Sequence, residues 1–432
     1  MSGKKLLLTN LLVLFVILFW NIFSINNHEQ EHKRKPHINV TEYDHLIEDI
    51  PEGYDWTAAF QAANDSLTSG GTIYVPAGVY YIKATGVLYD KKERDKPTGG
   101  VSLGNNVELK LSPDAVLKAI PNDSESYAIL RVADKSNVKI YGKGVIQGDR
   151  NEHKATNGEW GYCIALNGAS NVTIKDVTVK NCWGDGVFLG AGIENGKIPS
   201  SNVKIKGIKA DNNRRQGISI IYAKNIVISD SRFENTNGTP PSSGIDLEPE
   251  SVVGYSVKNV LIEKSYFFNN AGFGILVHGD VTGTVVTGNT CNQNGASGIV
   301  FFKVKDGIAK NNTCLTNKES GINIDKSSGV IVKDNILENN KNGISLVGGS
   351  NNNTVYHNSI KNSLINGINL VEVSSNTIKS NTSQFNKENG FYLYNSTSNI
   401  IINNKCKNNN KGIYLNGNSE NNTIKNNDCL KE

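Results

Sequence analysis

Six residues in the middle of the chain have the side-chain chemistry of a catalytic site: Asp185, Arg214, Arg215, Asp246, Glu248 and His278. Carboxylates, guanidinium groups and an imidazole are the groups that acid–base catalysis and stabilisation of a developing charge require. Asp246, Glu248 and Glu250 alternate along one short segment. Their negative charges repel one another unless a metal cation or an arginine neutralises them. This set predicts a site for acid–base chemistry on a charged or polar substrate.

One reaction that suits this set is removal of the C5 proton of a uronic acid. The substrate carboxylate must be neutralised, so that charge spreading onto it is stabilised, and a base must stand on one face of the ring. Arg214 or Arg215 would neutralise the carboxylate. His278, Tyr162 or a nearby lysine would act as the base.

A calcium ion is an alternative means of neutralising the substrate carboxylate. Asp246, Glu248 and Glu250 would supply the oxygen ligands that Ca²⁺ takes. The sequence indicates no other cofactor. Trp183, Glu250 and Tyr162 are the predicted substrate-binding residues.

Several activities remain open at this point. If the 4-oxygen leaves after proton removal, the enzyme is a polysaccharide lyase; if a proton returns from the opposite face, it is a C5-epimerase. An inverting glycoside hydrolase would use two separated carboxyl groups, either Asp185 with Asp246 or Asp246 with Glu248. A non-catalytic cell-wall glycan-binding protein would instead present outward aromatic residues such as Phe302 and Tyr392.

A repeating backbone must position these residues. Glycine followed by Ile, Val or Phe recurs ten times from Gly186 to Gly412, at spacings of 22 to 31 residues. Such a period indicates a solenoid. Each glycine opens a run of alternating apolar and polar residues, such as 321–325, which is typical of a half-buried strand, and Asn-rich corners follow. We therefore expect an all-β protein with the fold of a parallel β-helix.

The alternation also predicts which side chains share a face. Residues one and three after each glycine should point inward, and residues two and four outward. The two outward columns contain Phe188, Ser219, Asp246, Leu276 and Val300, and Gly190, Ile221, Glu248, His278 and Phe302. The three longest spacings lie between Gly186 and Gly274. Extra residues in a solenoid form loops on one face, so we expect the site among these coils.

The six cysteines fall into three close pairs. These are Cys163 with Cys182, Cys291 with Cys314, and Cys406 with Cys429, separated by 19, 23 and 23 residues. Each separation is roughly one coil, and stacked coils lie within the range that a disulfide tolerates. We predict bridges in at least the latter two pairs, and hence an oxidising compartment.

The N-terminus predicts attachment to a membrane. Residues 6–25 are largely apolar and contain no acid or base, which is long enough to span a bilayer, and no small-x-small cleavage site precedes Asn26. We predict a signal anchor over 1–25, a linker over 26–44 and a β-helix domain over 45–432. The body would lie outside the cytoplasm on a single-pass anchor, or be secreted if the segment is cleaved.

A capping helix and the overall composition complete these predictions. Residues 55–64 have the pattern of a capped amphipathic helix, which would close the open end of a solenoid. The net charge is only +4, and clusters of Lys and Arg interleaved with aromatic residues are absent. This composition argues against nucleic acid as a partner. The expected partners are an acidic polysaccharide and the membrane.

The segments 55–82 and 142–149 resemble the pectate-lyase-like superfamily of right-handed parallel β-helix proteins. The resemblance covers roughly 56–432 and implies an extended glycan bound along one sheet face. It does not extend to the motifs of polygalacturonase-like hydrolases, which are absent.

A second, partial resemblance is to mannuronan C5-epimerases. Their coils carry an Asp-Gly-Phe step and, one coil later, an Asp-Arg-His-Gly-Phe step, which are similar to 184–187 and 213–218 here. The resemblance carries over the arginine, at Arg215. The histidine of that family is Gln216 in this chain, and its outward aspartate falls on Gly190. Its Tyr-x-x-Asp-x-His segment has no counterpart near Tyr162.

Overall fold

The computed structural model describes residues 35–85, 99–194 and 196–429. Residues 37–432 form one compact unit. The predicted anchor, residues 1–25, lies outside the described residues. Among the described residues, no helix has the length and apolar character needed to cross a membrane.

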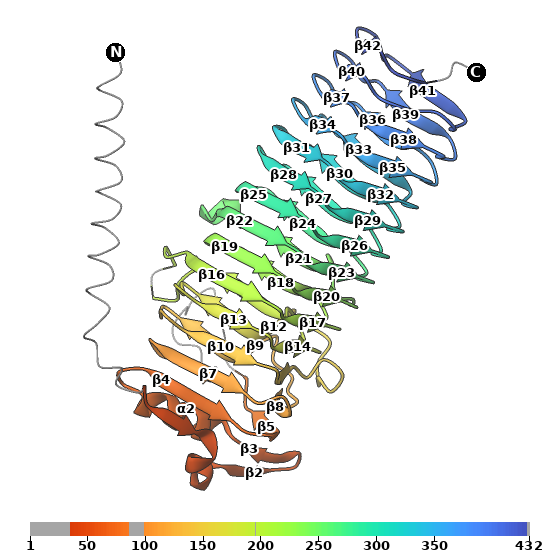
Figure 1. The fold of residues 1–432 in the computed structure, drawn as a ribbon. Coiled ribbons are helices and arrows are strands. Elements are labelled where there is room, and N and C mark those ends of the chain that lie inside the picture. Colours follow the sequence, from red (N-terminus) through yellow and green to blue (C-terminus); the bar gives the residue numbers. More distant parts are fainter. Residues whose placement is uncertain (1–34, 86–98, 195, 430–432) are drawn as a thin grey trace, which may run out of the picture. The chain divides into compact units, whose positions relative to one another are not determined.

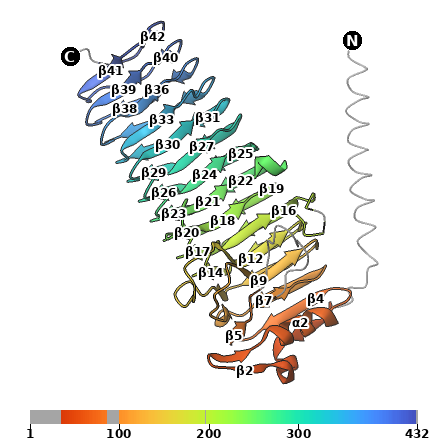
Figure 2. The same cartoon turned by 180° about the vertical axis from the view of Figure 1, so that it is seen from behind.

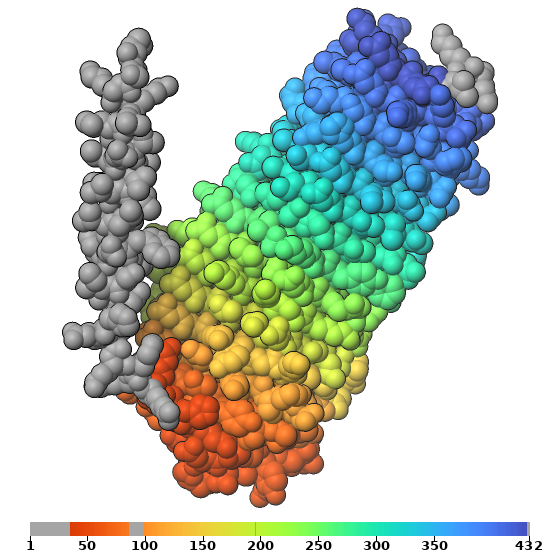
Figure 3. Space-filling view, viewed as in Figure 1, coloured from red at the N-terminus to blue at the C-terminus, as the bar shows by residue number. Residues whose placement is uncertain are grey.

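The unit is a parallel β-helix built from three long sheets, here called A, B and C (Figures 1 and 2). Most coils give one strand to each sheet in the order A, B, C. Apart from β2 and β3, which pair antiparallel, the strands pair in parallel with their equivalents one coil away, as β15 pairs with β12 and β18. Viewed with all atoms, successive coils form continuous bands from the N-terminal to the C-terminal end of the unit (Figure 3).

Sheet A has fifteen strands: β1 His37–Asn39, β4 Gly71–Val75, β7 Val107–Leu111, β10 Lys139–Gly142, β13 Thr173–Lys175, β16 Ser200–Lys206, β19 Ala223–Ser229, β22 Val257–Glu263, β25 Val281–Thr287, β28 Gly307–Lys310, β31 Val330–Lys333, β34 Thr354–Tyr356, β37 Thr377–Lys379, β40 Ile400–Ile402 and β42 Thr423–Lys425.

Sheet B has fourteen strands: β2 Glu48–Ile50, β3 Gly53–Asp55, β5 Gly78–Ile82, β8 Ala115–Ala119, β11 Val145–Gln147, β14 Thr178–Lys180, β17 Lys209–Asp211, β20 Arg232–Glu234, β23 Tyr266–Phe268, β26 Thr290–Asn292, β29 Thr313–Leu315, β32 Ile336–Glu338, β35 Ser359–Lys361 and β38 Thr382–Gln384.

Sheet C has thirteen strands: β6 Val101–Ser102, β9 Ser126–Ala133, β12 Trp160–Asn167, β15 Val187–Gly190, β18 Gln216–Ile220, β21 Ser243–Leu247, β24 Ile275–His278, β27 Ile299–Phe302, β30 Ser320–Asp325, β33 Asn342–Val347, β36 Ile368–Val371, β39 Asn389–Tyr394 and β41 Lys411–Asn416.

The predicted alternation is confirmed in sheet C. Ile218 and Ile220 of β18 are buried in the core between the sheets, as are their equivalents on neighbouring coils. The first outward column is in register, because Ser219 pairs with Phe188 on one side and with Asp246 on the other. In the second column, His278 pairs with Phe302. The sequence therefore predicted which side of the sheet these side chains project from. The expectation that they face solvent is wrong for the first column, where Ser219 and Asp246 are 0% and 1% exposed because other side chains cover them.

The N-terminal end is closed by helices. The predicted helix is α2, Thr57–Ser66, whose first turn is capped by Asp55: its Oδ1 accepts a 2.8 Å hydrogen bond from the Thr57 N–H. Phe60 is buried and meets Tyr80 edge-on, with ring centroids 5.7 Å apart. The 3₁₀ helix η1, Val40–Leu46, packs beside α2.

The folded unit begins earlier than the sequence analysis placed it. Strand β1 pairs with β4, and Val40 is fully buried, so 37–44 belong to the β-helix although the sequence analysis assigned them to a linker. Asn39 and Glu42 form a capping box that holds η1. The polar composition of 37–44 concealed this role.

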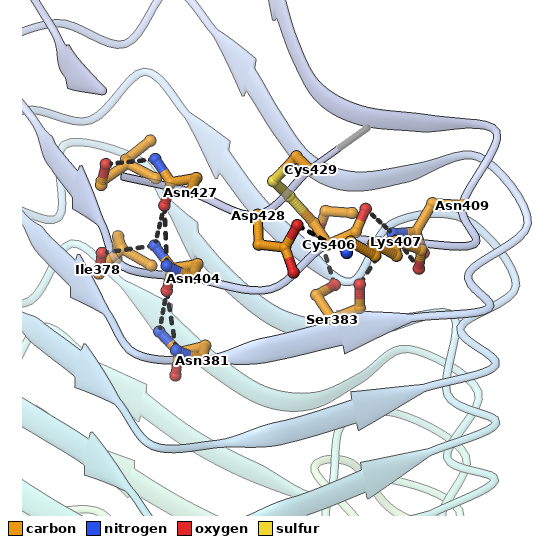
Figure 4. Close-up of a disulfide and its surroundings, with 12 residues drawn as sticks. Ile378, Asn381, Ser383, Asn404, Cys406, Lys407, Asn409, Asn427, Asp428 and Cys429 are labelled. Carbon is orange, nitrogen blue, oxygen red and sulfur yellow. Dashed lines mark hydrogen bonds and ion pairs between the residues drawn. A yellow bond between two sulfur atoms is a disulfide. The ribbon is translucent and has the colours of Figure 1, made fainter. Parts of the chain in front are cut away.

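The regular coils are lined inside by ladders of asparagine. In one ladder, Asn404 Nδ2 donates to Asn427 Oδ1 at 2.9 Å and to the Ile378 carbonyl at 3.0 Å, while its Oδ1 accepts from Asn381 (Figure 4). Each side-chain amide thus provides a hydrogen-bond partner for a backbone carbonyl at a buried corner of the coil. Many asparagines at the corners, such as Asn311 and Asn339, have the positive φ that this residue tolerates.

Two of the cysteine pairs are bridged. Cys406 and Cys429 form the disulfide in Figure 4, with Cα atoms 4.6 Å apart, as predicted. Cys163 and Cys182 form the second, with Cα atoms 5.7 Å apart.

The predicted Cys291–Cys314 bridge is wrong, because both residues are free and buried. They are direct register partners in β26 and β29. Lys405 and Asp428, which precede the bridged Cys406 and Cys429, are also register partners, so register does not distinguish the bridged pair from the free one. Coil spacing alone therefore does not predict a disulfide.

Candidate active site on sheet C

Arg215 is the centre of a charged cluster on the outward face of sheet C. It lies in the turn before β18, and its Nη1 is 2.8 Å from Glu248 Oε1 and 3.3 Å from Asp185 Oδ2. Its Nη2 donates to Glu248 Oε2 at 2.9 Å, which makes the pair with Glu248 two-pronged. Burial alone would lower the pKa of Arg215, but Asp185 and Glu248 raise it above its ordinary value. The guanidinium remains charged.

Asp185, one coil before Arg215, is completely buried. Burial raises its pKa to about 7; the attraction of Arg215 opposes this rise, and Glu248 and Glu159 add to it. Although Asp185 contacts Arg215, desolvation is the larger effect, since the same guanidinium is already paired with Glu248. Its Oδ1 has no hydrogen-bond partner among the described residues. Asp185 is thus a carboxyl group that holds its proton close to neutral pH.

Asp246 is the second buried carboxyl group of the cluster. It points outward from β21, is 1% exposed, and accepts a 3.0 Å hydrogen bond from Gln216 Nε2. Burial raises its pKa well above the ordinary value, and the charge of Glu248 raises it further. Gln216 is itself fixed, because its Oε1 accepts from the Ser243 N–H at 2.9 Å.

Glu248 is the more accessible carboxylate of the cluster. It follows β21 and leans back over the sheet toward Arg215, where the Ser219 hydroxyl also donates to its Oε1 at 2.7 Å. Its side chain is 19% exposed and that of Arg215 is 14% exposed. These two side chains therefore form the part of the cluster that a ligand can reach.

His278 lies on the next coil, at the end of β24. Its column neighbour is Phe302, with ring centroids 5.0 Å apart. Half-burial lowers the pKa of His278, and the Lys303 ammonium lowers it further, against the opposing effect of Glu248. The imidazole is therefore neutral and able to accept a proton at neutral pH.

The structure separates Arg214 from Arg215, although the sequence analysis grouped them. The Arg214 guanidinium lies over the Trp183 ring, 3.8 Å from its centroid, and its Nη1 donates to the Gly158 carbonyl at 2.8 Å. The His153 ring also stacks on Trp183, with the two ring centroids 3.9 Å apart. Trp183 is 8% exposed, so it packs between these two side chains rather than facing a glycan. We infer that Arg214 and Trp183 hold the loop formed by residues 148–159 in place.

Two other predicted residues differ in their relation to the cluster. Tyr162 is buried on β12, stacked on Phe188 with centroids 4.5 Å apart, and lies close enough to Arg215 to influence its pKa. Glu250 is exposed at the start of the 3₁₀ helix η2, Ser251–Val253, outside the cluster. The three carboxylates suggested for calcium are therefore not gathered. Within the described part of the chain, no three His, Cys, Asp or Glu side chains are placed to hold a metal ion.

Sequence reasoning missed three members of the cluster: Glu159, Gln216 and Ser219. Ser219 was placed on the outward column without a role, and Gln216 was noted only as a departure from another family. Glu159 Oε1 is 3.8 Å from Arg215 Nε, and it comes from the 148–159 loop. No repeat period fixes the path of that loop. Ser219 would have been found if every polar residue of the outward columns had been taken as a candidate site residue.

The fold and the repeats define the class of this protein. The sequence profile of the family described as "Right handed beta helix region" matches residues 130–248, 241–383 and 347–429. The chain therefore belongs to the right-handed β-helix family.

Comparisons with individual proteins agree on the fold. The uncharacterized protein YclG of Bacillus subtilis (strain 168) is 30% identical over 261 residues, which cover 55% of this chain and 44% of YclG. The chain thus spans less than half of that relative's length. The A-module of mannuronan C-5 epimerase AlgE4 from Azotobacter vinelandii superimposes with a TM-score of 0.59 at 18% identity, over 90% of this chain and all of that chain.

A third comparison is with a hydrolase. The catalytic unit of a GH87 α-1,3-glucanase from Streptomyces thermodiastaticus strain HF3-3 gives a TM-score of 0.58 at 14% identity, over 92% of this chain and 70% of that chain. At such identities the likeness extends to the fold alone. The epimerase and the glucanase therefore do not decide the reaction; the side chains of this site must.

Proposed function

We propose that this protein acts on a uronate-containing polysaccharide by removing the C5 proton, as a lyase or a C5-epimerase. The observation that carries the proposal is the Arg215–Glu248 pair on the outward face of sheet C, one coil from the neutral imidazole of His278. A cation beside a base is the pairing that this reaction needs. A mannuronan epimerase shares this fold, so the scaffold is compatible with the reaction.

Each residue has a definite role in this proposal. The uronate carboxylate lies against Arg215, and the C5–H bond breaks as its proton passes to a ring nitrogen of His278. The electron pair left on C5 spreads into the carboxylate, where the guanidinium stabilises the added negative charge. Expulsion of O4, which takes up a proton from solvent and leaves with the neighbouring sugar, then gives a C4=C5 double bond; a proton returned from solvent on the opposite face instead gives the epimer.

The exposure of the carboxyl groups argues against a hydrolase. A glycosidase needs a protonated carboxylic acid in contact with the glycosidic oxygen. Here the two carboxyl groups with raised pKa values, Asp185 and Asp246, are 0% and 1% exposed. The accessible one, Glu248, is bound by Arg215 through two nitrogens and by the Ser219 hydroxyl, so both of its oxygens are already engaged. Asp185 and Asp246 are therefore buried behind the Arg215–Glu248 pair, out of contact with a glycosidic oxygen.

The test is to incubate the protein with mannuronate, guluronate, galacturonate and glucuronate polymers. Three products are measured: the ultraviolet absorbance of unsaturated uronate, the change in C5 configuration by NMR, and new reducing ends. Absorbance identifies a lyase and an altered configuration an epimerase. New reducing ends without either change would overturn the proposal in favour of a hydrolase.

We also propose that the body lies outside the cytoplasm, held by a membrane anchor at residues 1–25. The disulfides Cys163–Cys182 and Cys406–Cys429 support an oxidising compartment. Protease added to intact cells should digest the body while sparing a cytoplasmic control protein. Protection of the body until the cells are lysed would contradict this location.

A further inference from the structure

A second group of side chains lies on the same face of sheet C, beyond His278. Phe302, at the end of β27, follows His278 in the outward column, and Lys303 and Lys326 follow the ends of β27 and β30. We call these three residues the lysine–phenylalanine patch. It begins two coils from Glu248, about 10 Å along the axis at the usual strand spacing.

The geometry of the patch converges on one aromatic ring. The ammonium of Lys303 is 4.8 Å from the centroid of the Phe302 ring, and that of Lys326 is 5.7 Å from it. Phe302 is half-buried, and both lysines are exposed. In the part of the chain that the structure describes, neither ammonium has an ion pair with an acid. Two cations and a ring face are thus available to a ligand.

Charges on both sides limit what the patch can bind. The next residue in the column after Phe302 is Asp325, and Glu248 lies on the other side of His278. The electrostatic influence of Lys303 on His278 places the patch beside the imidazole. An anion is therefore attracted at Phe302 and repelled one coil farther on. The patch has room for one anionic unit rather than a continuous track.

The chemistry of the patch matches an acidic sugar. A uronate carboxylate forms charge-assisted hydrogen bonds with ammonium groups, and the C–H groups of the same sugar pack against the part of the ring that the ammonium groups leave uncovered. We propose that the lysine–phenylalanine patch is a binding subsite for a second uronate residue of the same chain whose reacting residue lies at Arg215. This proposal rests on the proposed function and adds to it that the enzyme acts within an oligomer rather than on a lone sugar.

The test compares two paired variants on uronate hexasaccharides of the four types named above. The double variant Lys303→Gln/Lys326→Gln should raise KM, and the Kd measured by calorimetry, on the order of tenfold. Its kcat should be nearly unchanged at a pH well above 6.5, where His278 is neutral with or without the Lys303 charge. Phe302→Leu should raise both severalfold. Lys305→Gln is the matched control, since this exposed lysine lies in the same turn without an aromatic partner among the described contacts, and its constants should stay near those of the wild type.

The outcomes separate the two proposals. Turnover by the wild type with a KM that the double lysine variant leaves unchanged would overturn the subsite and leave the function standing. Wild-type binding that the double variant weakens, without any turnover, would support the subsite and overturn the function. If no hexasaccharide binds to the wild type, both proposals fail. A Lys305→Gln effect equal to that of the double variant would mean general charge attraction and would also overturn the subsite.

Discussion

The coils from β27 to β40 and the coils from β12 to β24 share one architecture but differ in how their polar groups are satisfied. In the later coils, the interior ladder from Asn289 to Asn427 repeats every 23 residues, and each inner asparagine donates to the next amide and to a backbone carbonyl. In the earlier coils, the turn between sheets B and C carries the charged side chains Asp185 and Arg215. The loops there are longer and irregular.

The difference is visible atom by atom. The buried side-chain atoms without a partner among the described residues include Asp185 Oδ1, Asp246 Oδ1 and Trp183 Nε1 in the earlier coils, and Ser363 Oγ in a later coil. Asn335, in a later coil, has both its amide nitrogen and its oxygen bonded. A buried polar atom without a partner costs stability. The later coils therefore serve as scaffold. The earlier coils contain the groups with altered pKa values, and their buried unpartnered atoms lower the stability of the fold.

The largest predicted effect is the loss of activity on replacing Arg215 in the earlier coils. Arg215→Lys keeps the charge but removes the two-pronged contact with Glu248, so kcat should fall about 10²–10³-fold. Turnover is measured on whichever uronate polymer the wild type converts. Arg232→Lys is the control, because Arg232 pairs with Glu234 on sheet B. Equal activities of both variants would remove Arg215 from the site.

Replacement of His278 should have the next largest effect. His278→Gln removes the proposed base, so kcat should fall about 10²-fold. Since burial and Lys303 lower the pKa of His278 from 6.5, the wild-type rate should decline only as pH falls through a value below 6.5. The pH–rate profile of the wild type measures that midpoint. A glutamine variant with the wild-type profile would show that another group is the base.

The structural role of the later coils is tested by replacing Asn335. Asn335→Ala leaves the Asn312 amide, the Asn358 oxygen and the Ala309 carbonyl without that partner, and should lower the free energy of unfolding by about 3 kcal/mol with kcat unchanged. Urea denaturation measures the loss. Asn323→Ala on the outward face of β30 is the control and should cost little. A loss of activity without a loss of stability would contradict the division of roles.

The pH dependence of stability tests the cost in the earlier coils. Asp185 has a pKa of about 7 in the folded protein and an ordinary value of 3.8, so between these values the folded state binds more protons than the unfolded state. Its contribution to the unfolding free energy therefore falls as pH rises from 3.8 to 7. Asp185→Asn should gain stability relative to the wild type by roughly 1–3 kcal/mol across this range. A constant difference at all pH values would argue against a raised pKa.

Periodicity explains how much the sequence could predict. The alternation after each glycine fixed the inward and outward residues of sheet C, so Asp246, Glu248 and His278 were placed on their correct columns. The helix at 55–64 followed from its capping residue and apolar spacing. These features depend on local geometry that repeats from coil to coil.

What the sequence could not predict lies in turns and loops. Arg214 and Arg215 are adjacent, yet one contacts Trp183 and the other Glu248, because a turn directs consecutive side chains to different sides. Glu159 reaches the cluster from a loop with no repeat period. The raised pKa of Asp185 depends on complete burial, which is a property of the packed coils rather than of local spacing.

The most direct test of the central claim is the reaction carried out in deuterated water and followed by NMR. If the earlier coils remove the C5 proton, the wild-type product should contain deuterium at C5 or a C4=C5 double bond, and Arg215→Lys should greatly slow the appearance of either. Product with new reducing ends and an untouched C5 proton would contradict the account.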